Sequence, residues 1–244
     1  SMGGGVVLQL LLDRPELVRS ITLQAPVPPH GFGSRLDGTP CTPDAAGTGG
    51  LGVNADFIAR LEAGDTSADE ATSPRSVFRS SYVAPGFDDG REDLWVESML
   101  STRTGPDNQP GDGIASDSWP GFAAGGRGIL NAMSVAHLDL TGIVEAPVKP
   151  AVLWIRGAHD AIVADESFFE FNTLGKHGIV PGWPGEEAAP PQPMIAQTRA
   201  VLDAYAANGG DYREVVFEGA GHSPHLEDEA RFVEELLAHV AAND

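Results

Sequence analysis

The sequence predicts a mixed α/β protein whose core is a mostly parallel sheet flanked by helices. Apolar runs of strand length alternate along the chain with segments of helical spacing, which is the order expected when helices connect parallel strands. A long segment rich in proline and glycine interrupts this alternation and predicts an inserted cap. The chain of 244 residues, 41% of them hydrophobic and 20% charged, is large enough for one substantial core.

The first predicted unit, residues 1–26, is a helix followed by a strand. The helix spans residues 3–13. Its apolar positions run nearly all round, which favours a buried position, and Pro15 ends it. The strand spans residues 18–23, a short β-branched run bounded by Pro26. We expect both elements to belong to the sheet core.

Residues 27–146 are predicted to form the inserted cap, made of short helices and long loops. Proline, glycine, threonine and aspartate dominate its beginning, which is typical of loops. Helical spacing is patchy and confined to the segments 56–64, 73–83 and 92–101. In the second of these, Ser73 followed by Pro74 is typical of a helix start.

Residues 147–244 return to the core pattern and carry the second half of the predicted sheet. The expected elements are a buried strand, a helix, a second strand and a final amphipathic helix, at residues 151–156, 194–208, 213–217 and 228–241. Between the first strand and the first helix, residues 175–193 hold five prolines. We therefore expect a loop there, near an opening of the fold.

Side chains suited to catalysis follow the ends of both late strands. Asp160 comes shortly after the strand at 151–156, and His222 follows the strand at 213–217. The carboxyl ends of parallel strands meet at one edge of a sheet, where the active residues of α/β proteins lie. Ser1 precedes both and stands directly before a buried helix. Serine, aspartate and histidine in this order predict a nucleophilic site that uses Ser1, Asp160 and His222.

Each of these residues also has a plainer interpretation. A Ser-Met start is what cloning can leave behind, and a carboxylate after a strand is often a helix N-cap. His159 and His225 compete for the role of base. We favour His222 because it directly follows Gly221 in the strand-end loop, whereas His225 is expected to pack or to cap.

Together these segments resemble the α/β-hydrolase family. The nucleophile elbow of that family reads G-x-S-x-G, and SMGG at residues 1–4 resembles its second half, beginning at the nucleophile. The similarity continues through the GxxD segment that ends at Asp160 and the GHSPHLED segment that contains His222. It covers residues 1–26 and 147–241, and the inserted cap matches nothing that we can assign.

The resemblance implies a serine hydrolase that needs no cofactor and no metal ion. Ser1 Oγ would attack an acyl carbon, and His222 would accept its proton. Asp160 would orient the imidazole, and the backbone N–H of Met2 would be one oxyanion donor. Carboxylic esters or related small acyl compounds are the expected substrates. Two alternatives stay open: an aminopeptidase of the proline-iminopeptidase type, and a non-catalytic binding protein that keeps the triad by descent.

The resemblance also implies a partner polypeptide. Relatives carry several strands before the nucleophile, together with the loop that supplies the second oxyanion donor. We therefore expect the N-terminal fragment of the same precursor to supply both. The expected cut lies directly before Ser1 and is made by the Ser1 hydroxyl, the alternatives being an external protease or a truncated fragment. A cytoplasmic location is expected, with secretion left open.

Charge and motif spacing argue against several other functions. The chain has 15 lysine and arginine residues against 35 aspartate and glutamate residues, a net charge of −20, so nucleic acid and anionic membranes are not expected partners. It has no apolar run long enough to span a bilayer, and its single cysteine, Cys41, rules out an internal disulfide. The G-x-G-x-x-G match at residues 47–52 follows no predicted strand, and residues 107–113 lack the spacing of a calcium loop. The acidic side chains of the cap are expected to form a solvated surface rather than a metal site.

Overall fold

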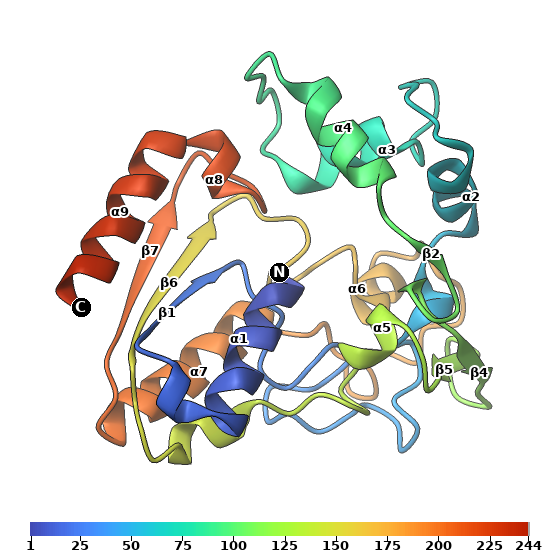
Figure 1. Ribbon diagram of the computed structural model, residues 1–244. Helices are drawn as coiled ribbons and strands as arrows, with labels where there is room; N and C mark the ends of the chain where they lie inside the picture. Colours follow the sequence, from blue (N-terminus) through green and yellow to red (C-terminus); the bar gives the residue numbers. More distant parts are fainter. Residues whose placement is uncertain (244) are drawn as a thin grey trace.

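The computed structural model describes residues 1–243 and has a parallel sheet at its centre (Figure 1). The strands lie in the order β1-β6-β7, with β1 at Ser20–Gln24, β6 at Ala151–Gly157 and β7 at Tyr212–Phe217. Both pairings are parallel, so the carboxyl ends of the three strands lie at one edge. The predicted α/β class with a parallel sheet flanked by helices is confirmed.

Helices cover both faces of this sheet (Figure 1). One face carries α1 (Met2–Asp13) and α7 (Met194–Ala207), and the other carries α9 (Glu229–Ala242). Successive side chains of β6 alternate between the faces: Trp154 packs on the side of α1 and α7, and Ile155 packs on the side of α9. Because both faces are buried, the strand is apolar at successive positions rather than at every second one.

Two glycines at the start of α1 allow this helix to pack closely against the chain that leaves β1. A Cβ atom at Gly4 would lie 2.6 Å from the Cβ of Pro26, and one at Gly5 would lie 2.9 Å from Cγ1 of Val27. Small residues are therefore needed here for the predicted helix to reach its buried position. The helix predicted at residues 3–13 is confirmed within one residue.

The inserted region holds short elements, as predicted, together with small strand pairs that the sequence did not predict. Its helices are α2 (Ala55–Ala63), α3 (Pro74–Val77), the π-helical turn η3 (Phe78–Tyr82), α4 (Glu92–Leu100) and α5 (Ile129–Ala132). Its strand pairs are β2 (Thr104–Gly105) with β3 (Gln109–Pro110) and β4 (Gly113–Ala115) with β5 (Phe122–Ala124). The side chain of Ser73 accepts a hydrogen bond from the N–H of Ser76, so the helix start predicted at Ser73 is confirmed.

Shorter turns complete the chain. They are the 3₁₀ turns η1 (Pro15–Leu17), η2 (Gly50–Gly52) and η4 (Thr141–Glu145) and the short helices α6 (Phe171–Lys176) and α8 (Pro224–Glu227). The turn η1 delays the start of β1 to Ser20, two residues later than predicted.

The division of the chain into residues 1–26, 27–146 and 147–244 stays a prediction. Leu140 and Ile143, which lie in the middle range, are fully buried in the core formed by α1, α7 and the sheet. None of the helices in the described part of the chain combines the length and the apolar content that a membrane crossing requires.

Candidate active site

Asp160 lies in the turn that follows β6, where it is held by backbone hydrogen bonds. Its Oδ1 accepts hydrogen bonds from the N–H groups of Ile162 at 2.8 Å and Val163 at 2.9 Å. The side chain is buried, with only 7% of the residue exposed. No helix begins at Asp160, so its plainer interpretation as a helix N-cap is wrong. The two N–H groups of the turn instead fix one carboxylate oxygen, and this contact also fixes the direction of the other.

His222 lies in the turn that follows β7 and contacts Asp160 directly. Its Nδ1 is 2.9 Å from Oδ2 and 3.1 Å from Oδ1 of Asp160, and the residue is 4% exposed. A carboxylate can only accept, so the contact favours the tautomer with the proton on Nδ1. Nε2 is then left as a proton acceptor, which is the form that a general base requires.

The two turns meet through their backbones, and glycine makes this possible. A Cβ atom at Gly157 would lie 2.0 Å from the carbonyl oxygen of Gly221 and 2.3 Å from that of Ala220. The N–H of His159 donates to Ala220 O at 2.9 Å. The glycine of the GxxD segment therefore permits the close approach that brings His222 to Asp160.

Ser1 is held at the same edge of the sheet by the end of β1. Its α-amine donates to Gln24 O at 2.6 Å, and its carbonyl accepts from Val27 N at 3.2 Å. The side chain of Gln24 in turn donates to His222 O at 3.4 Å. Gln24 thus contacts both residues, although no hydrogen bond joins Ser1 to His222 within the described chain. The structure therefore links Ser1 to His222 through Gln24 rather than by direct contact.

The α-amine of Ser1 has an unusual electrostatic environment. Burial lowers its pKa from 8.0 to about 6, and the negative charge of Asp160 acts in the opposite direction. The amine is desolvated although the residue as a whole is exposed.

Met2 supplies a backbone donor next to Ser1. It is the first residue of α1, so its N–H has no acceptor within the helix. The N-terminal end of a helix also carries partial positive charge, which stabilises a negative oxygen nearby. This N–H is suited to the oxyanion role that the family resemblance implies for it.

The two rival histidines have different surroundings. His159 is exposed. His225 is also exposed, and its ring lies 5.9 Å from that of Phe232. Desolvation lowers the pKa of His225, and the charges of His222 and of the Ser1 amine act in the same direction. His225 is therefore a neighbour of the site, whereas the carboxylate contact belongs to His222.

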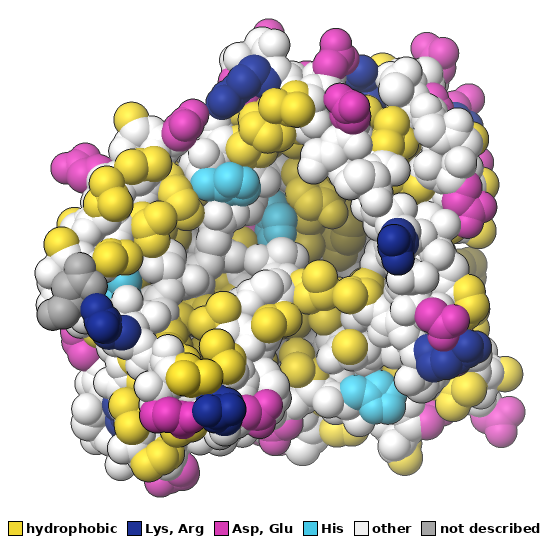
Figure 2. Space-filling model, in the orientation of Figure 1, with side chains coloured by type: hydrophobic (Ala, Val, Ile, Leu, Met, Phe, Trp, Pro, Cys, Tyr) yellow, Lys and Arg dark blue, Asp and Glu magenta, His cyan; other side chains and the backbone are white. Residues whose placement is uncertain are grey.

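Apolar side chains from several segments pack together beside His222. The ring of Tyr82 meets the His222 ring edge to face, with centroids 5.8 Å apart and an interplanar angle of 83°. The same tyrosine packs on a cluster of apolar side chains from the Asp160 turn, α7 and the cap: Phe32, Ile162, Val163, Met194 and Ile195. Figure 2 shows a hollow in this face of the molecule, bordered by hydrophobic side chains and a histidine. The sequence analysis missed Tyr82, because no spacing relates this cap residue to His222.

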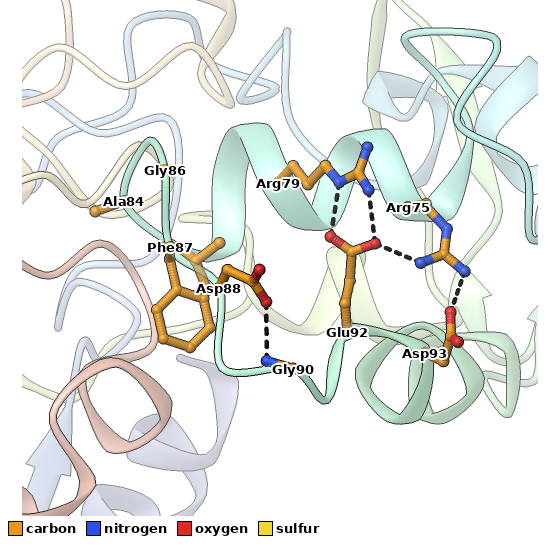
Figure 3. A pocket seen from close by; sticks show the side chains of 10 residues that line it. Arg75, Arg79, Ala84, Gly86, Phe87, Asp88, Gly90, Glu92 and Asp93 are labelled. Carbon is orange, nitrogen blue, oxygen red and sulfur yellow. Dashed lines mark hydrogen bonds and ion pairs between the residues drawn. The ribbon is translucent and has the colours of Figure 1, made fainter.

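A cavity in the cap is lined by ion pairs (Figure 3). It measures about 520 Å³ and lies between η3, α4 and the loop that joins them. Arg79 contacts Glu92 at 2.6 Å, Arg75 contacts Asp93 at 2.6 Å, and Arg75 also pairs with Glu92. Because the guanidinium groups of Arg75 and Arg79 are already paired with carboxylates, the cavity is poorly suited to bind an anionic ligand.

Other chemistry-bearing groups lie apart from this site. Cys41 is partly buried in the cap, where burial raises the pKa of its thiol and its Sγ accepts from Asn172 at 3.5 Å. Within residues 1–243, histidine, cysteine and acidic side chains form no group of three that could hold a metal ion.

Comparison with known proteins finds similarity among solved structures. No protein-family model matches this chain, and no curated protein matches it. An esterase (EaEST) from Exiguobacterium antarcticum is similar to it, with a TM-score of 0.45 and 17% sequence identity. The alignment covers 99% of this chain and 64% of the esterase, so the chain spans less than two thirds of that protein's length. The strand order and the flanking helices of this chain confirm the α/β class with a parallel sheet.

Proposed function

We propose that this chain carries the catalytic residues of a serine hydrolase that cleaves carboxylic esters or related acyl compounds. The observation that carries the proposal is the buried contact of 2.9 Å between His222 Nδ1 and Asp160 Oδ2. It lies at the sheet edge where Gln24 holds Ser1. A histidine oriented by a carboxylate beside a serine is the arrangement that activates a hydroxyl nucleophile.

The proposed reaction has two steps. Ser1 Oγ attacks the acyl carbon while His222 Nε2 takes the hydroxyl proton, and Asp160 stabilises the resulting imidazolium. The imidazolium then protonates the leaving alcohol, and an ester between Ser1 and the acyl group remains. A water molecule, activated by the same imidazole, hydrolyses this ester and returns the proton to Ser1. The N–H of Met2 would stabilise the negative oxygen in both steps.

Ester substrates are favoured over substrates with a free amine. The hollow in the face shown in Figure 2 is bordered by hydrophobic side chains, and the ring of Tyr82 lies against His222, which suits an acyl chain. The acidic groups of the cap that could attract an ammonium group include Glu92 and Asp93, and both are paired with arginine. An aminopeptidase is therefore the second candidate, and a non-catalytic binding protein is the third.

Chromogenic substrates and a covalent probe test this assignment. We expect hydrolysis of p-nitrophenyl esters in preference to aminoacyl nitroanilides, with loss of turnover in Ser1→Ala and His222→Ala. His159→Ala is the control, because this histidine is exposed and outside the site. A fluorophosphonate should label the wild-type protein. Absence of both labelling and turnover in the complete protein would favour the non-catalytic alternative.

We further propose that additional strands, supplied by the N-terminal fragment of the same precursor, extend the sheet beyond β1. Three surfaces support this. In the described residues β1 pairs with β6 on one side only, so its other edge is open. The helix α1 exposes an apolar stripe formed by Met2, Val6 and Leu10. The helix α9 exposes a second stripe formed by Val233, Leu237 and Val240. Strands added beside β1 would pair its edge, and the fragment would cover apolar surface and supply the second oxyanion donor.

The interaction and its origin can be tested separately. We expect the fragment and this chain to purify as one complex and to gain about 10²–10³ in rate over this chain alone, because one oxyanion donor is worth that much. We propose that the Ser1 hydroxyl makes the cut by attacking the carbonyl before its own nitrogen, after which water hydrolyses the ester. A longer precursor with Ser1→Ala should then stay uncut, whereas Ser1→Cys should still cleave. Cutting of the alanine precursor in a purified system would contradict cleavage by the Ser1 hydroxyl. It would not contradict the proposed complex between the fragment and this chain.

A further inference from the structure

Glu227 connects two segments that are distant in sequence and meet at the site. It is the last residue of α8, the short helix that follows His222. One carboxylate oxygen accepts from the N–H of Gly221 at 2.7 Å, and the other accepts from the N–H of Ala84 at 2.5 Å. Gly221 belongs to the turn that carries His222, and Ala84 belongs to the cap.

We propose that Glu227 is a positioning residue that fixes the His222 turn and the cap segment 82–84 as one unit. The proposal rests on the proposed function only for its effect on turnover. A carboxylate that accepts two backbone N–H groups makes charge-assisted hydrogen bonds, which are shorter and stronger than neutral ones. Through them Glu227 sets the position of the base without contacting substrate itself.

Steric contact supports the same pairing. A Cβ atom at Gly221 would lie 2.8 Å from Ala84 N and 2.8 Å from Val83 C, which are both backbone atoms. The two segments are thus packed backbone to backbone, and the carboxylate closes the contact. Because the two segments are held together, the ring of Tyr82 lies edge-on against His222.

A role as an ordinary helix-end acceptor does not account for the contacts of Glu227. Neither N–H belongs to α8: Gly221 precedes the helix, and Ala84 comes from the inserted cap. Loss of the carboxylate would therefore free the cap segment and the His222 turn together, while β6 and α7 would keep their own contacts.

The test combines hydrogen exchange, proton NMR and kinetics on the full chain and on its complex with the N-terminal fragment. In Glu227→Ala we expect amide exchange to rise at least tenfold in peptides that cover Ala84 and Gly221, with β6 and α7 unchanged. The downfield resonance of the His222 Nδ1 proton should broaden. Turnover should fall mainly in kcat, because the base is displaced while the hydrophobic border of the hollow remains. Glu227→Gln keeps the size of the side chain and one acceptor oxygen, so we expect it to be intermediate.

The matched control is Glu218→Gln, which also removes one negative charge. Glu218 is exposed and lies at the start of the turn after β7, which leads to His222. We expect it to change none of the three measurements. Unchanged exchange at both amides in Glu227→Ala would overturn the proposal, and so would a rise spread evenly over β6 and α7. If exchange and the Nδ1 resonance respond as expected but wild-type protein hydrolyses no ester, the positioning role stands and the proposed function fails.

Discussion

Replacing Gly157 with alanine should separate the turn that carries Asp160 from the turn that carries His222. The added Cβ would lie 2.0 Å from Gly221 O and 2.3 Å from Ala220 O. Both are backbone atoms, so no side chain can swing away to relieve the overlap. The backbone at Gly157 has no positive φ, so the substitution acts through steric contact alone.

The size of the effect follows from these distances. Relieving the overlap even to a tight 3.0 Å requires the two turns to move apart by about 1 Å. The contact between His222 Nδ1 and Asp160 Oδ2 would then lengthen from 2.9 Å to about 3.9 Å, beyond hydrogen-bond distance. A displacement of this size at a catalytic group costs about 10²-fold in rate. Overpacking costs about 1–3 kcal/mol in the free energy of unfolding.

Thermal unfolding, the His222 Nδ1 proton resonance and ester turnover together measure this effect. The matched control is Gly219→Ala, in the turn after β7, where an added Cβ meets no atom within 4 Å and φ is not positive. We expect the control to behave as wild type in all three. The reasoning is refuted if Gly157→Ala keeps both the resonance and the turnover of the wild-type protein.

Three further predictions concern charge and proton transfer. Asp160→Asn keeps the shape of the residue but can present a donor to Nδ1, and by analogy with serine proteases kcat should fall about 10⁴-fold with little change in melting temperature. His222→Ala should abolish ester turnover while His225→Ala keeps most of it, since Asp160 contacts His222; the reverse result would reassign the base. Burial raises the pKa of Glu170 above its ordinary value of 4.5. The hydrogen bonds that the carboxylate accepts from Asn172 and Thr173 lower the pKa, but their effect is smaller than that of burial. The folded state then binds this proton more tightly than the unfolded state, so the free energy of unfolding should fall as pH rises from 4.5 through the folded-state pKa. Glu170→Gln should flatten this part of the pH dependence measured by denaturant unfolding; an unchanged slope would contradict the prediction.

The sequence predicted the elements whose pattern is local. The run at 151–156 has the continuous apolar character of a buried strand, and β6 spans Ala151–Gly157. The helix predicted at 194–208 is α7, and the strand at 213–217 is β7 to within one residue. The meeting of Asp160 with His222 also followed from a general rule, because the carboxyl ends of neighbouring parallel strands lie side by side.

What the sequence did not reveal depends on contacts between distant segments. No sequence spacing relates Tyr82 to His222, yet the two rings lie against each other. No spacing relates Glu227 to the cap, yet its carboxylate joins the cap to the His222 turn. The short pairings β2–β3 and β4–β5 were missed for a similar reason. Strands of two or three residues carry no periodic signal, and tertiary context decides them. The prolines and glycines of the cap indicated loops without showing where those loops pack.

The measurement that tests the central claim most directly is the site of covalent modification by a fluorophosphonate. The protein, assembled with its proposed N-terminal fragment, would be labelled, digested and mapped by mass spectrometry. The account predicts one adduct, on Ser1, whose formation is lost in His222→Ala and greatly slowed in Asp160→Asn. An adduct on a different residue, or ester hydrolysis by an assembled protein in which Ser1 stays unmodified, would contradict it.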